Sequence, residues 1–252
     1  MLKVDCSRLP YPKIRYGDQT YNITPAEAKW NLGNKQFLST KDHERTVSYK
    51  ILYEGKVETA HIDQIRQNFE GQLRKLQVGN AAHLGTHQQQ VNVQGLRYGL
   101  QQAQRDEVDL VILVLRSKGQ DVYSNFKYLA DCVFGIPSIV MVTASNYRGQ
   151  AWNATGLDQY IGNIMMKANL KLGGINHSAE SAEGNIERYL GNTLVLGSDV
   201  THPSNGSLFG CPSVAALVGS VDDTGGCFLG SLRLQSKGSK EVRYRAFCVF
   251  SY

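Results

Sequence analysis

Val108-Asp-Leu-Val-Ile-Leu-Val-Leu115 is the stretch of sequence that decides the fold. It is a nearly continuous run of branched apolar residues, which is typical of a strand buried on both faces, as in a parallel sheet. A second run, Ile136-Pro-Ser-Ile-Val-Met-Val142, follows a segment with helical character at about 122–133. Another helix is predicted over about 156–172, and Gly173-Gly174 ends it. Strand, helix, strand, helix predicts a Rossmann-like, doubly wound α/β unit with right-handed crossovers.

The residues before this unit have less regular patterns. Residues 1–45 are predicted to form an extended linker, because prolines and turn sequences interrupt regular structure there. Residues 47–53 alternate like a strand. Apolar residues recur at helical spacing over about 60–77, and a further helix is predicted from Leu96 to Arg105.

A second unit begins near residue 185. Strands are predicted at 193–199, 214–220 and 227–234, and the turn sequence at 222–226 joins the last two. Three successive strands with short connections indicate an antiparallel meander. The chain reaches only Tyr252, so the meander is expected to be an incomplete part of a larger domain.

The composition narrows the class of protein. A chain of 252 residues with 42% hydrophobic and 19% charged residues is globular rather than disordered. The net charge of +5 suits an anionic partner, although a solvated surface with a few extra lysines would give the same value. Five scattered cysteines without a Cys-x-x-Cys pair argue against zinc and for a reducing compartment. No signal peptide or membrane-spanning run is visible, so a soluble, cytoplasmic protein is expected.

Three lysines and a tyrosine form the most informative polar pattern. Tyr123 and Lys127 lie four residues apart, as do Lys167 and Lys171, and each pair falls in a predicted helix. Residues four apart share one helix face, and two lysines so placed repel each other unless an anion lies between them. Open α/β sheets bind ligands beyond the carboxyl ends of their strands, where the first turn of the helix carrying Tyr123 offers free amide groups. The pattern therefore predicts a site for the phosphorylated end of a nucleic acid where that helix begins.

Other interpretations of these residues stay open. Lysines on helices more often coat a solvated surface, and Tyr123 could be half-buried in the core. A small-molecule enzyme of the α/β class could use the same phosphate pocket. The sequence contains neither Gly-x-x-x-x-Gly-Lys nor Gly-x-Gly-x-x-Gly, which argues against a common nucleotide hydrolase or dehydrogenase.

Three segments resemble, in the right order, a eukaryotic Argonaute protein. Trp30-Asn-Leu-Gly-Asn-Lys-Gln-Phe37 is similar to the second linker of that family. Asn163-Ile-Met-Met-Lys-Ala-Asn-Leu-Lys-Leu-Gly-Gly-Ile-Asn176 is a very specific match to its Mid domain, and Gly197-Ser-Asp-Val-Thr-His-Pro203 is similar to the start of its Piwi domain. The resemblance implies a linker over 1–45, a Mid domain over 46–184, and the N-terminal part of an RNase H-like Piwi domain over 185–252.

The resemblance implies that the chain binds the 5′-phosphate and first nucleotide of a small guide RNA in RNA silencing. Tyr123 would stack on the first base, and Lys127, Lys167 and Lys171 would bind phosphate oxygens. Where animal relatives have a phosphate-binding glutamine this chain has Ile139, so a nearby hydroxyl such as Ser138 or Thr143, or water, is expected to substitute. The backbone of one loop would inspect the first base; that loop contains Arg116, Ser117, Lys118, Gly119, Gln120 and Asp121.

Catalysis is not expected from this chain as given. The family's slicing centre resembles that of RNase H, in which several carboxylates hold two divalent ions. Asp199 matches the first of these acids, and His202 is interpreted as structural. One carboxylate cannot hold two Mg²⁺ ions, so guide-directed RNA cleavage is expected only of a longer parent protein, and binding the guide needs no cofactor.

The alternatives differ in their partners. A metal-dependent endoribonuclease would act on a target RNA paired to the guide. A scaffold would bind tryptophan-containing silencing proteins, although relatives do so through a part of Piwi that lies largely outside this sequence. No membrane partner is expected.

Overall fold

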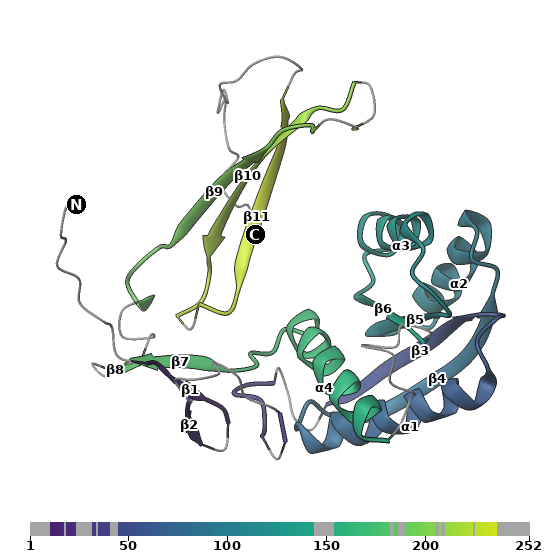
Figure 1. The fold of residues 1–252 in the computed structure, drawn as a ribbon, viewed down its shortest axis with the longest axis horizontal. Helices are drawn as coiled ribbons and strands as arrows, with labels where there is room; N and C mark the ends of the chain where they lie inside the picture. The colour runs from purple at the N-terminus through teal and green to yellow at the C-terminus, as the bar shows by residue number, and fades with distance from the viewer. Residues whose placement is uncertain are drawn as a thin grey trace, which may run out of the picture. The chain divides into compact units, whose positions relative to one another are not determined.

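The computed structural model describes residues 11–17, 19–23, 32–33, 35–40, 45–143, 154–181, 184–185, 190–204, 207, 210–223 and 225–235. The chain divides into two compact units (Figure 1). One unit is Arg15–His177, and the other combines Met1–Ile14 with Ser178–Tyr252. The division by function into linker, Mid and Piwi parts stays a prediction.

The first unit is built on a four-stranded parallel sheet in the order β4-β3-β5-β6. Its strands are β3 (Thr46–Glu54), β4 (Asn80–Gln89), β5 (Leu110–Leu115) and β6 (Ser138–Val142). All six residues of β5 are buried, as expected for a central strand covered on both faces. The apolar run at 108–115 therefore forms the predicted parallel strand.

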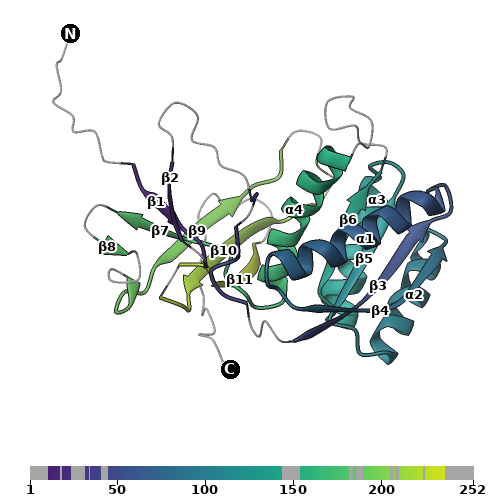
Figure 2. The ribbon, with the colours of Figure 1, turned by 90° about the horizontal axis from the view of Figure 1, so that it is seen from below.

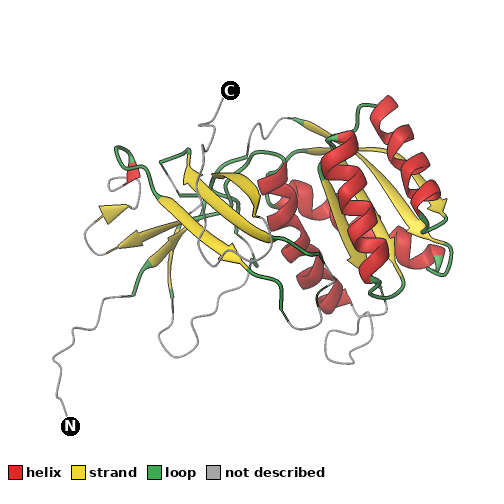
Figure 3. Cartoon of the chain, turned by 90° about the horizontal axis from the view of Figure 1, so that it is seen from above, coloured by secondary structure: helices red, strands yellow, loops and turns green. Residues whose placement is uncertain are grey.

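Helices cover both faces of this sheet. They are α1 (Thr59–Lys75), α2 (Val93–Arg105), α3 (Gln120–Lys127), the π-helix η1 (Tyr128–Phe134) and α4 (Ala154–Lys171). Figures 2 and 3 show α1 beside α4, whereas α2 packs with α3 and η1. The predicted α/β class with a parallel sheet is confirmed. None of the helices in the described ranges is long and apolar enough to cross a bilayer.

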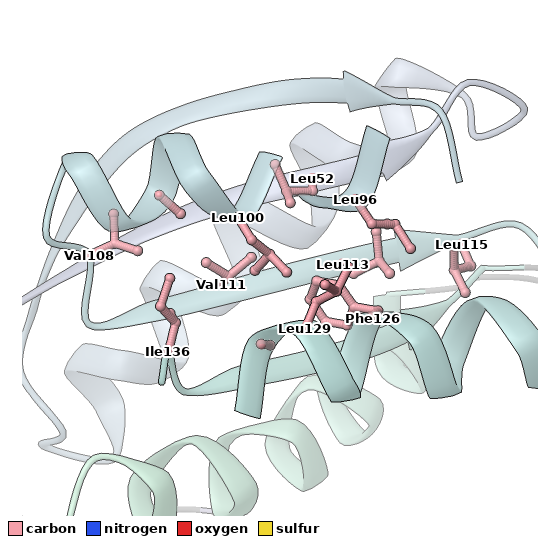
Figure 4. Close-up of a cluster of buried hydrophobic side chains, with 12 residues drawn as sticks. Leu52, Leu96, Leu100, Val108, Val111, Leu113, Leu115, Phe126, Leu129 and Ile136 are labelled. Atoms are coloured by element: carbon pink, nitrogen blue, oxygen red, sulfur yellow. The ribbon is translucent and has the colours of Figure 1, made fainter. Parts of the chain in front are cut away.

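One hydrophobic cluster joins the sheet to α2, α3 and η1 (Figure 4). Leu113 of β5 and Phe126 of α3 are fully buried there. Alternate residues of β5 point to the same face of the sheet, so Val111, Leu113 and Leu115 all enter this cluster. The packing fixes the helix that carries Tyr123 and Lys127 against the sheet. The other cluster members are Leu52, Leu96, Leu100, Ala103, Val108, Leu129, Ala130 and Ile136.

Strand β4 is absent from the sequence-based prediction. Its sequence, Asn80-Ala-Ala-His-Leu-Gly-Thr-His-Gln-Gln89, lacks the alternation that identifies a strand. It is an edge strand with β3 as its one neighbour, and its register shifts near Gly85, which has a φ of 129°. An edge strand is held mainly by backbone hydrogen bonds and needs few buried side chains. Such a strand leaves no apolar pattern in the sequence by which it could be predicted.

The second unit contains the predicted antiparallel meander. Strands β9 (Leu196–Thr201), β10 (Ser213–Ser220) and β11 (Phe228–Gln235) pair in the order β11-β10-β9. Both pairings are antiparallel, with β10 in the centre. The RNase H-like assignment of this meander stays a prediction.

The segment predicted to be an extended linker contains local structure. Strands β1 (Lys13–Arg15) and β2 (Thr20–Asn22) fall within it, whereas Trp30 lies outside the described residues. Phe37 is buried, and Ser39 forms an antiparallel bridge with Ile175. The end of this segment is therefore fixed to the first unit. Two further short strands, β7 (Ser178–Ser181) and β8 (Gly184–Asn185), pair antiparallel.

Candidate anion-binding site

Lys127 is the centre of a compact polar cluster. Its ammonium Nζ donates to the Ser138 hydroxyl at 2.6 Å and to the Ser138 carbonyl oxygen at 3.3 Å. The same ammonium forms an ion pair with both carboxylate oxygens of Asp131 at 3.0 Å. The Ser138 hydroxyl lies 3.4 Å from the Asp131 carboxylate and can donate to it. Three hydrogen bonds and the ion pair therefore hold the Lys127 side chain in one place.

The other two predicted lysines belong to the same cluster. Partial burial lowers the pKa of Lys171 below its ordinary value, and the positive charge of Lys127 lowers this pKa further. The charge of Lys167 acts in the same direction, while the Asp131 carboxylate raises the Lys171 pKa. These shifts require the four charged groups to share one neighbourhood. The effects of the Lys127 and Lys167 charges on the Lys171 pKa are in line with the predicted convergence of the three lysines, and their role in binding a phosphate stays a prediction.

The cluster surrounds the amino-terminal end of the edge strand β6, of which Ser138 is the first residue. Helices α3 and η1 approach from one face of the sheet, and α4 comes from the other (Figure 1). Lys171 is the last residue of α4, where the helix dipole favours a positive charge. Two helices from opposite faces thus bring lysines to the same edge strand of the sheet.

The sequence predicts the site where the helix of Tyr123 begins, and the structure shows Lys127 reaching away from that point. The loop before α3 follows Leu115, which pairs with Val142, whereas Lys127 reaches Ser138 at the opposite end of β6. Four residues of strand separate these two ends by about 13 Å. The loop that leads into α3 and the contact between Lys127 and Ser138 therefore lie at opposite ends of β6.

The loop predicted to read the first base is shorter than expected. Helix α3 begins at Gln120, with Gly119 as its N-cap residue, so Gln120 and Asp121 belong to the helix. The stem of the loop is held by Glu54, whose carboxylate accepts from the Arg116 amide at 2.9 Å. Arg116, Ser117 and Lys118 are exposed.

Tyr123 lies between this loop and the lysine cluster. It is one helical turn before Lys127 on the same face of α3, and 47% of its surface is exposed. An exposed aromatic ring offers a face on which a base can stack. Tyr123 is therefore placed to contact a group that extends from the lysines toward the loop.

The structure separates the two hydroxyl groups proposed to replace the missing glutamine. Ser138 is in direct contact with Lys127, whereas the Thr143 hydroxyl donates to the Leu115 carbonyl oxygen at 3.3 Å. Ile139 is buried in β6 and pairs with Ile112. Of these side chains, Ser138 is the one that belongs to the cluster.

Asp131 is the site residue that the sequence analysis missed. It lies four residues after Lys127, which is the spacing of a helical ion pair, and that spacing could have identified it. With all three lysines protonated, the cluster carries three positive charges and one negative charge. Asp131 is the counter-ion of Lys127, and its charge also favours the protonated form of Lys171.

Asp199 does not form a metal site with the residues that the structure describes. It is exposed within β9, two residues before the strand ends, and its carboxylate accepts from the amide of Val200 at 2.8 Å. No group of three or more His, Cys, Asp or Glu suited to a metal ion occurs in the described ranges. These residues do not fit a Mg²⁺ pair, and we derive no cleavage step from them. The His202 ring nitrogen Nδ1 lies 2.9 Å from the Ser213 hydroxyl. This contact supports the predicted structural role of His202.

Comparison with known proteins identifies the family. The Piwi domain family matches residues 110–249, which is more than half of the chain. Protein argonaute 15 of Oryza sativa subsp. japonica is 27% identical over 224 residues, covering 85% of this chain and 23% of the relative. The chain belongs to the Argonaute/Piwi family.

Solved structures share the fold. Kluyveromyces polysporus Argonaute, crystallised with a guide RNA, matches with a TM-score of 0.71 and 24% identity, covering 94% of this chain and 28% of that one. The MID-PIWI domains of N. crassa QDE-2 match with a TM-score of 0.57 and 23% identity, covering 75% and 52%. The fold is that of an Argonaute MID-PIWI region, and the chain spans about a quarter of the rice relative.

The charge coupling within the cluster can be measured by NMR titration of ¹⁵N-labelled lysine ammonium groups. The midpoint for Lys171 is expected below the ordinary value of 10.5. Asp131→Asn removes a favourable negative charge and should lower the Lys171 pKa further, whereas Lys127→Ala removes a positive charge and should raise it. A Lys171 midpoint that responds to neither substitution would show that these groups are not neighbours.

Proposed function

We propose that this chain binds the 5′-phosphate and first nucleotide of a small guide RNA, as part of an Argonaute protein in RNA silencing. The observation that carries the proposal is the cluster of Lys127, Asp131 and Ser138. The charges of Lys127 and Lys167 both act on the pKa of Lys171, which adds the other two lysines to this neighbourhood. The related Kluyveromyces Argonaute was crystallised with a guide RNA, which supports the choice of ligand.

The charge of the cluster favours a terminal phosphate over a backbone phosphate. Three lysines and Asp131 leave a net charge of two positive units. A phosphate monoester carries about −1.5 to −2 near pH 7, whereas each phosphodiester in a nucleic acid strand carries one negative charge. The 5′-terminal phosphate therefore matches the cluster better than any internal phosphate of the same RNA.

The first nucleotide would extend along α3. Its phosphate would lie at Lys127, Lys167 and Lys171. Because this chain has Ile139 where animal relatives have a phosphate-binding glutamine, the Ser138 hydroxyl would donate to the phosphate instead. Its base would stack on Tyr123, whose ring is exposed one turn nearer to the start of α3. The loop at 116–119 would then lie beyond the base, where its backbone can inspect the base edge.

The remaining functional expectations concern the longer protein. Target RNA, tryptophan-containing silencing proteins and Mg²⁺-dependent cleavage involving Asp199 are proposed for a longer parent protein. The proposed guide-binding step itself needs no cofactor, and the proposed compartment is the cytoplasm.

The lysines are tested by comparing RNA with a 5′-phosphate and RNA with a 5′-hydroxyl. Lys127→Ala and Lys171→Ala should each weaken binding of the phosphorylated RNA by about 1.5–3 kcal/mol, because each removes a hydrogen bond to a charged group. Binding of the hydroxyl form should change much less. Fluorescence anisotropy titrations at two salt concentrations measure both effects, and the phosphorylated RNA should show the steeper salt dependence.

Lys75→Ala is the matched control, because Lys75 is also an exposed lysine in the last turn of a helix, α1. It should leave the preference for the 5′-phosphate unchanged. Equal binding of the two RNAs by the unsubstituted protein would remove the proposed function.

Asp131 makes a second test, because it competes with the ligand for the lysines. Asp131→Asn removes the carboxylate that pairs with Lys127 in the free protein and that would repel a bound phosphate. The preference for 5′-phosphorylated RNA should rise by about threefold to tenfold, which corresponds to ~0.7–1.4 kcal/mol.

The control for this change is Asp121→Asn, which removes a carboxylate from the first turn of the same helix. Its effect on the preference should be smaller than that of Asp131→Asn. A larger effect at Asp121 would place the phosphate where α3 begins, contrary to the proposal.

A further inference from the structure

Two buried asparagines join the end of α4 to the chain on either side of it. Asn169 is 1% exposed and lies between Lys167 and Lys171 on this helix. Its side-chain amide donates to the Asn176 side-chain oxygen at 3.0 Å and lies 3.3 Å from the Ser39 carbonyl oxygen. A single amide group thus connects three segments of the first unit.

Asn176 completes the connection from outside the helix. Its side-chain amide donates at 3.0 Å to the carbonyl oxygen of Met166, the residue before Lys167. Met166 lies five residues before the end of α4, so this bond ties Asn176 to the body of the helix and not only to its last turn. The backbone of Asn176 also accepts from the Leu38 amide at 3.0 Å.

The chain between Asn169 and Asn176 makes a tight turn that leaves no room for a side chain at Gly174. Gly173 has a φ of 85°, and the Gly174 amide donates back to the Asn169 carbonyl oxygen at 2.8 Å. A Cβ atom on Gly174 would lie 2.1 Å from the Asn169 side-chain oxygen. The Gly173-Gly174 pair therefore does more than end the helix, because it lets Asn176 reach back to Asn169.

We propose that Asn169 and Asn176 are positioning residues for the phosphate site, and that they fix Lys167 and Lys171 opposite Lys127. This inference rests on the proposed function. Both lysines lie within one helical turn of Asn169 on α4. The side-chain amides of Asn169 and Asn176 hold this part of the helix next to the bridge between Ser39 and Ile175.

Lys167 and Lys171 need the hydrogen bonds of Asn169 and Asn176 because the lysine ammonium groups repel one another. Lys167 and Lys171 belong to α4 and Lys127 to α3, and the charges of Lys127 and Lys167 both act on Lys171. Repulsion of this kind is relieved if the end of α4 frays or turns away. The buried amides oppose that movement, so the phosphate meets three ammonium groups already in place, which lowers the cost of binding.

The experiment measures the phosphate preference, defined as the Kd of 5′-hydroxyl RNA divided by the Kd of 5′-phosphorylated RNA. Asn169→Ala and Asn176→Ala should each lower this preference by about tenfold, because a misplaced lysine loses a hydrogen bond to a charged group. Asn163→Ala, at an exposed position of the same helix, should leave the preference unchanged. Circular dichroism of each variant establishes that it is folded at the assay temperature, and Asn176→Ala carries the test if Asn169→Ala is unfolded.

A double-mutant cycle separates positioning from a general effect on stability. In a protein that already carries Lys167→Ala and Lys171→Ala, adding Asn176→Ala should cause little further loss of preference, because the amide acts through these lysines. An undiminished preference in folded Asn169→Ala and Asn176→Ala, or full additivity in the cycle, would overturn the inference. If the unsubstituted protein shows no preference at all, the proposed function fails instead.

Discussion

Electrostatic repulsion among three lysine ammonium groups is the constraint on which the site depends. Lys127, Lys167 and Lys171 share one neighbourhood at the edge of a parallel sheet, and Asp131 is the anion held among them. One carboxylate neutralises only one of three positive charges, so the cluster keeps an excess that a doubly charged phosphate can balance. The surrounding structure must hold the lysines together until that ligand arrives.

The fold provides this arrangement through its crossovers. Helix α3 leaves the carboxyl end of β5 and returns with η1 to the amino end of β6, while α4 returns to that end over the other face. The ends of both returning helices therefore lie near the first residue of the same edge strand. The hydrophobic cluster around Leu113 and Phe126 fixes one helix, and the Asn169–Asn176 pair fixes the other.

Residue spacing predicted most of the elements of the first unit and drew attention to the three lysines, but it did not show that Lys127 reaches the amino-terminal end of β6. The apolar run at 108–115 identified the central strand because both of its faces are buried. Strand β4 gave no such signal, since an edge strand is held by backbone pairing rather than by an apolar stripe. The sequence placed the anion where α3 begins, whereas Lys127 reaches Ser138 at the other end of β6, because i, i+4 spacing gives a shared face but not the direction in which long side chains reach. The ion pair of Asp131 with Lys127 could have been predicted from their i, i+4 spacing, but the contact of Asp131 with Ser138, which comes from another element, has no signal in the sequence.

A crystal structure of the protein with uridine 5′-monophosphate tests the central claim most directly. The account predicts phosphate oxygens within hydrogen-bond distance of the Lys127 and Lys171 ammonium groups beside Ser138, with the Asp131 carboxylate turned away from Lys127. A phosphate bound instead to the backbone amides of residues 119–122, with the Lys127–Asp131 ion pair intact, would contradict it.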